Sequence, residues 1–322
     1  MNIRLTEKQK EEIAAGLKGR DFIALIDYSS EELMYLIEQA IELKRKLKNG
    51  EVYQPLKGKT LGMIFDKNST RTRVSFEVGM YQLGGHALFL SGQDLQLGRG
   101  ETVLDTAQTL SRYLNGIMIR TYAHKTVIEL ARGATIPVIN GLTDLMHPCQ
   151  ALADYQTIYE KKGKLAGLKL AYIGDGNNMV HSLMMGGSKL GLHVAVATPE
   201  GYEPNPDIVQ LSKEQAELTG GKITLHRDPK EAAADADVIY TDVWASMGFE
   251  HERLERERAF RNYQVNDDVV KYAKPDYLFM HCLPAHRGEE VSESVIDGPN
   301  SIIFDQAENR LHAQKAIMAA LM

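Results

Sequence analysis

The hydrophobic positions of this chain fall into short apolar runs, and the stretches between them are long enough for helices. A first series of runs lies at 60–65, 86–91, 116–121 and 136–140. A second series lies at 168–174, 193–199, 222–226, 237–243 and 277–282. Nearly continuous apolar strands separated by helices are typical of parallel sheets that are covered on both faces. The pattern therefore predicts an α/β fold with two doubly wound parallel-sheet domains.

Two segments have the spacing of helices rather than strands. Residues 29–49 carry apolar side chains three and four positions apart, and Ser29 begins a capping box. Residues 147–162 show the same spacing and join the two series of strands. We therefore expect a first domain at 1–150 and a second at 151–306, joined by a helix.

The most charged part of the chain is the segment 248–262. We interpret it as the solvated face of a helix, and a mobile lid is the less favoured alternative. No internal repeat or low-complexity tract interrupts the two series of strands.

Length and charge exclude several classes of protein. A chain of 322 residues holds two domains of ordinary size. It carries 37 basic and 43 acidic residues, a net charge of −6, and no basic run, so we expect no nucleic-acid partner. No segment approaches the roughly 18 apolar residues of a membrane span, so we expect no membrane partner.

Cysteine usage and the first twenty residues indicate a cytoplasmic location. The two cysteines, Cys149 and Cys282, cannot form the disulfide framework of a small secreted domain. The first twenty residues are polar and include acidic groups, which matches neither a signal peptide nor a transit peptide. A reducing compartment fits both observations.

Hydroxyls and cations follow the first apolar run, where a helical pattern begins. Ser69, Thr70, Arg71 and Thr72 stand at this predicted helix start. Free backbone N–H groups at a helix N-terminus bind anions, and these side chains add further donors, so the segment predicts an oxyanion or phosphate site. On capping grounds alone, an ordinary N-cap followed by surface arginines is equally compatible.

Two other strand ends of the first half favour the functional interpretation. The third run ends at Arg120, and the fourth is followed by His147 and Gln150. Ligands of open α/β sheets bind at the carboxyl ends of the strands, so an arginine, an imidazole and an amide are expected near the predicted anion site. A structural role is the more common one for a lone histidine, but this one shares the strand edge with two arginines.

The strand ends of the second half are neutral or acidic. They carry the segment 174–178, then Asp242 with Ser246 and Met247, then the segment 281–284. A site with a carboxylate, amides and few cations suits an amino group better than a second anion. The sequence Gly-Asp-Gly-Asn-Asn at 174–178 lacks the third glycine of a dinucleotide fingerprint, so we discount a nicotinamide cofactor.

Metal binding is the less favoured interpretation of the last motif. His281, Cys282 and His286 are metal-ligating residue types, but the chain contains no Cys-x-x-Cys pair. We therefore expect neither a metal nor an organic cofactor, and we interpret Cys282 as a thiol near a reacting centre.

Taken together, these motifs resemble those of the transcarbamylase family. Ser-Thr-Arg-Thr-Arg at 69–73 matches its carbamoyl phosphate signature, and His-Pro-Cys-Gln at 147–150 resembles its His-Pro-x-Gln. Asp242 with Ser-Met-Gly at 246–248, and His-Cys-Leu-Pro at 281–284, are similar to the ornithine branch. The likeness runs in order along nearly the whole chain, apart from the first twenty residues.

The resemblance implies transfer of the carbamoyl group of carbamoyl phosphate to the side-chain amine of L-ornithine, which gives L-citrulline and phosphate in arginine metabolism. The implied carbamoyl phosphate ligands are Ser69, Thr70, Arg71, Thr72, Gln96, Arg120, His147, Gln150, Cys282, Leu283 and Arg310. The implied ornithine ligands are Asn178, Asp242, Ser246 and Met247. The implied catalytic residues are Cys282, Arg120, His147 and Asp242.

The resemblance also implies a homotrimer, or a multiple of trimers, in which Gln96 is lent to a neighbouring subunit. The C-terminal helix, from about residue 307 to 322, is expected to return to the first domain. No cofactor is implied, because carbamoyl phosphate is already activated.

Two alternatives stay open. Putrescine is the rival amine, although it lacks the carboxylate that an amino-acid site would hold, and aspartate would need cations in the second half. A non-catalytic relative that binds anions is the rival from another class, because a fold alone does not establish activity.

Overall fold

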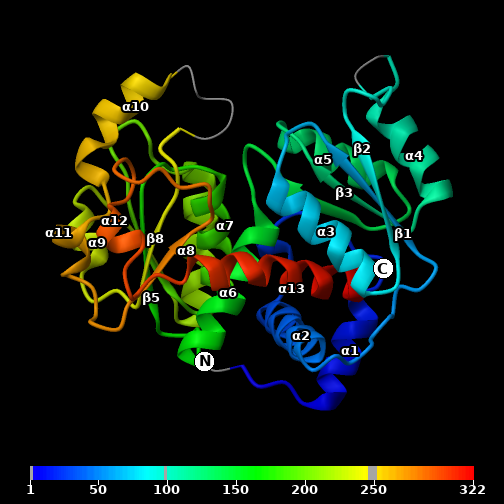
Figure 1. The fold of residues 1–322 in the computed structure, drawn as a ribbon, viewed down its shortest axis with the longest axis horizontal. Coiled ribbons are helices and arrows are strands. Elements are labelled where there is room, and N and C mark those ends of the chain that lie inside the picture. Colours follow the sequence, from blue (N-terminus) through cyan, green and yellow to red (C-terminus); the bar gives the residue numbers. More distant parts are fainter. Residues whose placement is uncertain (1–2, 98–99, 246–251) are drawn as a thin grey trace. The chain divides into compact units, whose positions relative to one another are not determined.

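The strands form two separate parallel sheets, which confirms the predicted α/β fold (Figure 1). The structure is a computed structural model that describes residues 3–97, 100–245 and 252–322. The four-stranded sheet has the order β2-β1-β3-β4, with β1 (Thr60–Phe65), β2 (His86–Ser91), β3 (Gly116–Arg120) and β4 (Val138–Leu142). The five-stranded sheet has the order β7-β6-β5-β8-β9, with β5 (Lys169–Ile173), β6 (His193–Ala197), β7 (Lys222–His226), β8 (Val238–Thr241) and β9 (Leu278–His281).

The chain divides into two compact units. The first unit contains residues 3–156 and 308–322, and the second contains 157–307. Two helices, α6 (Pro148–Lys162) and α13 (Ile303–Leu321), begin in one unit and end in the other.

Helices connect the strands of each unit. The first unit holds α1 (Glu7–Leu17), α2 (Ser30–Lys48), α3 (Thr70–Gln82), α4 (Val103–Tyr113) and α5 (His124–Gly133), with the 3-10 turn Leu25–Asp27. The second unit holds α7 (Asn178–Lys189), α8 (Pro206–Thr219), α9 (Pro229–Ala233), α10 (Arg253–Phe260), α11 (Asp267–Val270) and α12 (Glu293–Ile296), with the 3-10 turn Arg261–Tyr263.

The two helices predicted from apolar spacing are confirmed. Ser29 caps α2, with its side chain accepting the Glu32 N–H and the Glu32 side chain returning to the Ser29 N–H. This capping box satisfies two N–H groups that would otherwise lack partners at the helix start. The predicted helix at 147–162 is α6.

Strand β4 lies two residues later than the apolar run 136–140 predicts. Pro137 explains the late start, because a proline has no N–H to donate to a ladder. Its carbonyl still accepts the N–H of Ile117, so the chain enters the sheet there and the paired strand begins at Val138.

Strand β2 departs from the expectation that both faces of each strand are covered. It stands at the edge of the four-stranded sheet, and its apolar side chains Leu88 and Phe89 are exposed. An apolar edge strand is a surface that most monomeric proteins avoid.

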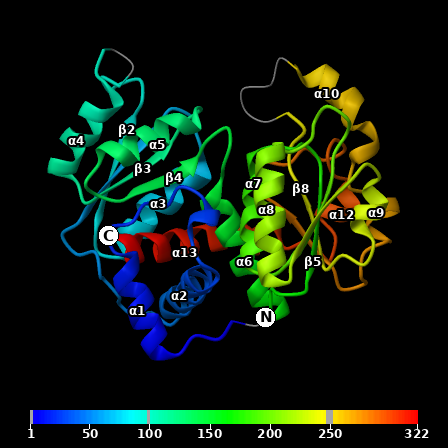
Figure 2. The same cartoon turned by 180° about the vertical axis from the view of Figure 1, so that it is seen from behind.

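Helix α1 was not predicted. Thr6 caps it and forms a capping box with Gln9, but Leu17 is its only fully buried residue, so the apolar signal is weak. The segment after it holds the end of α13: Gly19 N–H donates to the Leu321 carbonyl, and Lys18 Nζ donates to the Ala319 carbonyl. Both views place α1 beside α2 and this end of α13 (Figures 1 and 2).

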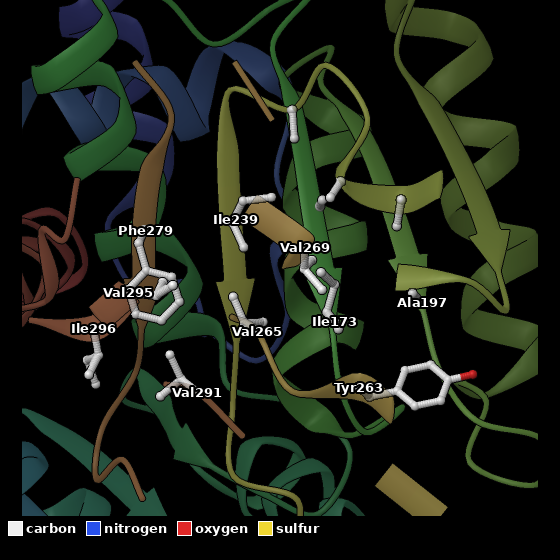
Figure 3. Packing of buried hydrophobic residues seen from close by; sticks show 14 of the residues in the cluster. Ile173, Ala197, Ile239, Tyr263, Val265, Val269, Phe279, Val291, Val295 and Ile296 are labelled. Carbon is white, nitrogen blue, oxygen red and sulfur yellow. The ribbon is translucent and has the colours of Figure 1, made fainter. Parts of the chain in front are cut away.

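One hydrophobic cluster of the second unit lies on one face of its sheet. Figure 3 shows Ile173, Ile239 and Phe279, from three neighbouring strands, packed with side chains of the segments that follow β9 and precede α11. Among them are Val291 and Val295, which anchor the chain that leaves β9. The polar ends of β5, β8 and β9 are therefore held by a common core.

None of the helices in the described parts of the chain combines the length and the apolar character needed to cross a bilayer.

Candidate active site

The predicted anion segment forms a capped helix start in the first unit. Ser69 is the N-cap of α3, and its Oγ accepts the Thr72 N–H at 3.2 Å and donates to Thr72 Oγ1 at 3.1 Å. Thr70 and Arg71 lie in the first turn of α3. The free N–H groups of this turn and the positive end of the helix dipole both face outward from the helix start. This end of α3 is therefore suited to bind an oxyanion.

Sheet register places Arg120 beside this segment. Arg120 ends β3 and pairs with Phe65, the last residue of β1, and the Asp66 N–H donates to the Arg120 carbonyl at 2.9 Å. Arg120 is buried, with only 4% of the residue exposed. A guanidinium held in such a place is costly without anionic or polar partners, and it interacts more strongly with an anion than it would in water.

Helix α13 adds a second buried guanidinium to the same half-site. Arg310, 3% exposed, donates from Nη1 to Gln150 Oε1 at 2.7 Å and from Nη2 to Thr72 Oγ1 at 3.2 Å. Gln150 in turn donates to Asp154 Oδ1 at 2.8 Å. These bonds connect the start of α3, the start of α6 and α13, and they bring together three residues that the sequence motifs named separately, Thr72, Gln150 and Arg310.

His147, which precedes α6, is a neutral imidazole in this environment. Burial lowers its pKa well below the ordinary 6.5, and the guanidinium groups of Arg310, Arg120 and Arg71 lower it further. A neutral imidazole carries one N–H and one lone pair, so it can donate a hydrogen bond to a carbonyl oxygen without adding a charge.

We expect the His147 ring to stay neutral as the pH falls to 6.5, the ordinary pKa at which an exposed imidazole is half protonated. Burial and three neighbouring cations both disfavour the imidazolium, so the two causes act in the same direction. Nitrogen-15 NMR of histidine-labelled protein checks this, with the His147 signals assigned from their absence in His147→Gln. A His147 ring that is half protonated at pH 6.5 would contradict its burial beside three cations.

A carboxylate and an asparagine occupy the strand ends of the second unit. Asn177 caps α7 and accepts the Met179 N–H at 2.9 Å through Oδ1. Its Nδ2 donates to Asp242 Oδ2 at 2.9 Å, which joins the end of β5 to the end of β8. Gly176 is required before it, because a Cβ at that position would lie 2.3 Å from the Glu203 backbone.

The thiol of Cys282 lies directly on this carboxylate. Cys282 Sγ–H donates to Asp242 Oδ1 at 3.0 Å, and the Val243 N–H donates to the same oxygen at 2.8 Å. The other cysteine is different: Cys149 is buried, burial raises its pKa to about 12, and it donates to the Asn140 carbonyl. Only Cys282 therefore stands at a strand end beside a charged group.

His281 orders the backbone around Cys282. The Leu283 N–H donates to His281 Nδ1 at 2.9 Å, so the ring proton is on Nε2, which donates to Glu290 Oε1 at 3.2 Å. Burial raises the pKa of Glu290, but hydrogen bonds from His281 and from the His286 N–H hold it below its usual range. Leu283 has φ of +60°, an uncommon value for a leucine that the loop must hold in place.

The remaining predicted residues are located by their positions in the chain. Asn178 is the first residue of α7, next to the capping Asn177. Gln96 lies exposed in the loop after β2 in the first unit. Ser246 and Met247 lie outside the described residues.

Sequence reasoning missed a buried ion pair at the end of β5. Arg256 donates from Nη1 to Asp175 Oδ2 at 2.9 Å and to the Trp244 carbonyl, and it also pairs with Glu252. Burial raises the Asp175 pKa to about 6, against the lowering effect of Arg256. Interpreting 248–262 as a solvated helix face is thus wrong for Arg256, because one polar side chain of α10 turns inward to a partner 81 positions away.

Two groups of described residues offer donor atoms for a metal ion. Asp242, His281 and Cys282 form one, and His286, Glu289 and Glu290 form the other. In the first group the thiol already donates to the carboxylate, and both ring nitrogens of His281 are engaged. Its chemistry is therefore that of a hydrogen-bonded thiol and carboxylate.

Comparisons with known proteins cover both units. A family model described as the carbamoyl-P binding domain of aspartate/ornithine carbamoyltransferase matches residues 20–160, and the model of the Asp/Orn binding domain matches 166–321. An ornithine carbamoyltransferase from Anoxybacillus flavithermus is 64% identical over 306 residues, which cover 95% of this chain and 98% of that protein.

Solved structures are similar over the same extent. The ornithine carbamoyltransferase structure from Pyrococcus furiosus has a TM-score of 0.93 and 61% identity, covering 95% of this chain and 98% of that one. The anabolic ornithine carbamoyltransferase structure from Campylobacter jejuni has a TM-score of 0.87 and 42% identity, covering 93% and 97%. These similarities extend well beyond the motifs at the strand ends.

Proposed function

Because the chain belongs to the aspartate/ornithine carbamoyltransferase family, we propose that it transfers the carbamoyl group of carbamoyl phosphate to the side-chain amine of L-ornithine. The products are L-citrulline and phosphate, and the reaction serves arginine biosynthesis. The observation that carries the proposal is the contrast between the two half-sites. Three cations surround His147 in the first unit, whereas the second unit presents a carboxylate with a thiol.

The first unit would bind carbamoyl phosphate. Ser69, Thr70, Arg71 and Thr72 would hold the phosphate oxygens at the start of α3, where backbone N–H groups and the helix dipole favour negative charge. As the bond to phosphate breaks, this segment would stabilise the departing anion. That role needs a fixed arrangement of donors, which the Ser69 to Thr72 hydrogen bonds support.

Arg120, His147, Gln150 and Arg310 would hold the carbamoyl group. Attack on a carbonyl builds negative charge on its oxygen, and a well-placed donor there contributes about 3–4 kcal/mol to transition-state stabilisation. Arg310 is fixed by Gln150 and Thr72, so it would meet the developing charge without reorganising. A neutral His147 would add a donor without repelling the neighbouring guanidinium groups.

The second unit would bind the amino acid. Asn178, Asp242, Ser246 and Met247 are its proposed ligands, with Cys282 and the Leu283 carbonyl facing the reacting groups. An alkylammonium has a pKa near 10.4, so losing its proton costs about 2.7 kcal/mol at about pH 8.4. Asp242 as a carboxylate would raise that pKa, so we assign it the positioning of the amine and assign Cys282 the control of its proton.

Catalysis in this scheme belongs to Arg120, His147, Asp242 and Cys282. The reaction has four steps: binding, carbonyl polarisation, amine deprotonation and phosphate departure. None of them needs redox or cofactor chemistry. Carbamoyl phosphate supplies the activated group, and the residues of the chain supply charge and orientation.

We also infer a homotrimer, or a multiple of trimers. Apolar side chains lie exposed on α3 and on the edge strand β2, namely Val74, Val78, Leu88 and Phe89. Such a surface is one that a second copy would cover. Gln96 follows β2 and is exposed, which supports the proposal that it completes the site of a neighbouring copy. A cytoplasmic location fits the two free cysteines.

The function is tested by measuring ureido product with carbamoyl phosphate and, separately, ornithine, putrescine, lysine or aspartate. We expect turnover with ornithine at least about a hundredfold above the others, because a site built for polar groups rejects analogues that leave those groups unpaired. Equal or faster turnover with putrescine would support carbamoyl phosphate binding by the first unit, but it would overturn the proposal that Asp242 helps to bind an amino acid. Carbamoyl phosphate binding with no product from any amine would identify a non-catalytic relative.

A further inference from the structure

A buried carboxylate closes the turn that follows Cys282. Glu290 is 0% exposed, and its Oε1 accepts the His286 N–H at 2.6 Å and faces His281 Nε2 at 3.2 Å. Within the described parts of the chain, no donor hydrogen-bonds its other oxygen, Oε2. A buried carboxylate oxygen without a donor costs stability, so its presence calls for a specific partner.

Two further residues place atoms that could bind a metal ion near this oxygen. His286 Nδ1 lies 3.6 Å from Glu290 Oε2, which is too long for a hydrogen bond. The distance of 3.6 Å is instead close to the separation of two ligand atoms on one tetrahedral metal ion, which is roughly 3.4 Å when the metal–ligand bonds are about 2.0–2.1 Å. Glu289 supplies a third ligand, and the ligand atoms of the three residues lie within 4.8 Å of one another.

We propose that His286, Glu289 and Glu290 form a binding site for one divalent transition-metal ion of the zinc class. The three residues join an imidazole nitrogen to two carboxylate oxygens, a mixed donor set that suits Zn²⁺ or Co²⁺. Magnesium and calcium prefer oxygen ligands alone, so they fit this set less well. The proposal goes beyond the carbamoyl transfer reaction and does not depend on it.

The turn is arranged to hold the three ligands before an ion arrives. Gly288, with φ of +88°, donates its N–H to the Val291 carbonyl at 2.8 Å, and Val291 is packed in the core of the second unit (Figure 3). Arg253 donates to Glu289 Oε1 at 2.6 Å and orients that carboxylate. Such support reduces the ordering cost of binding.

Solvent reaches the site from one side. The side chains of His286 and Glu289 are 52% and 30% exposed, while that of Glu290 is fully buried. An ion would therefore reach the buried oxygen from the side of His286 and Glu289. This combination of accessible and buried ligands is absent from the His226–Glu231 contact of the same unit, where His226 Nδ1 lies 3.4 Å from the largely exposed Glu231.

The rival explanation is a simple ion pair between a protonated His286 and Glu290. A second rival is metal binding at the thiol of Cys282, which stands with Asp242 and His281 in the other group of donors. The experiment must therefore separate histidine from thiol ligation. A Cys282→Ser background removes the thiol and leaves the turn 286–290 unchanged.

The test is titration of the full-length Cys282→Ser protein with Co²⁺, followed by visible absorption and by competition with Zn²⁺. We expect one Co²⁺ per chain with the d–d bands of nitrogen and oxygen ligation and without a thiolate charge-transfer band. In the same background, His286→Ala should weaken binding at least about tenfold, because one of three ligands is lost. Glu289→Gln should also weaken it.

The matched control is His226→Ala, which removes a histidine in a His–Glu contact of similar length but without a buried orphan oxygen. It should bind Co²⁺ as tightly as its parent. Loss of all binding in Cys282→Ser alone would overturn the proposal in favour of the thiol. Unchanged affinity in His286→Ala would overturn it too, and would leave the ion pair as the explanation of the turn.

Discussion

Replacing Arg310 with methionine is expected to lower the rate of carbamoyl transfer by about a hundred- to a thousandfold, the usual effect of removing one donor to a developing oxyanion. The guanidinium is nearly fully buried and is held by Gln150 and Thr72, so it is fixed before the reaction. Methionine keeps much of the volume and loses the charge and the hydrogen bonds to Gln150 and Thr72. Initial rates of ureido product formation at saturating ornithine measure the effect.

An exposed arginine of the same unit provides the control. Arg132, in the last turn of α5, is exposed, and Arg132→Met should keep the rate within about twofold. Circular dichroism of both variants separates a lost catalytic group from lost folding. An Arg310→Met variant that folds and keeps more than a tenth of the rate would remove Arg310 from the proposed mechanism.

Replacing Asp242 with asparagine is expected to lower kcat/KM for ornithine by at least about a hundredfold. Asp242 accepts hydrogen bonds from Asn177, Val243 and Cys282. An amide offers one acceptor oxygen and two donors, so it would leave at least one of these groups facing another donor. It would also lose the negative charge that positions the ammonium form of the substrate.

The matched control is the carboxylate at the other end of the same strand. Asp237 precedes β8 and Asp242 follows it, and both are buried. Asp237 accepts the Lys169 N–H and pairs with Lys274, at the end of the sheet opposite to Asp242. Asp237→Asn should reduce thermal stability and leave kcat/KM for ornithine within about threefold. Equal kinetic losses in both variants would show that Asp242 acts through folding alone.

The sheets could be predicted because their strands are nearly continuous apolar runs. Three strands, β1, β2 and β7, begin and end where the apolar pattern does. The errors have local causes: Pro137 cannot donate to a ladder, so β4 begins late. Strand β2 is apolar without being covered within the unit, and apolar character alone does not distinguish a core from an interface.

The candidate site was predictable where residues at neighbouring strand ends share one edge. Ser69 follows β1 and Arg120 ends β3, and the register of these adjacent strands brings both to one place. The partners of Asp175 and His281 were not predictable in this way. Arg256 is the one buried charged residue among those that the structure describes in its run, and Glu290 stands beside a partly exposed Glu289 that looks the same in sequence.

Calorimetric titration with carbamoyl phosphate alone tests most directly the division of labour between the two units. The unmodified protein and Asp242→Asn should bind it with dissociation constants that agree within about threefold. Arg310→Met should bind it about 10- to 100-fold more weakly, because a charge-assisted hydrogen bond contributes about 1.5–3 kcal/mol. Full affinity in Arg310→Met, or an equal loss in Asp242→Asn, would contradict the assignment of carbamoyl phosphate to the first unit.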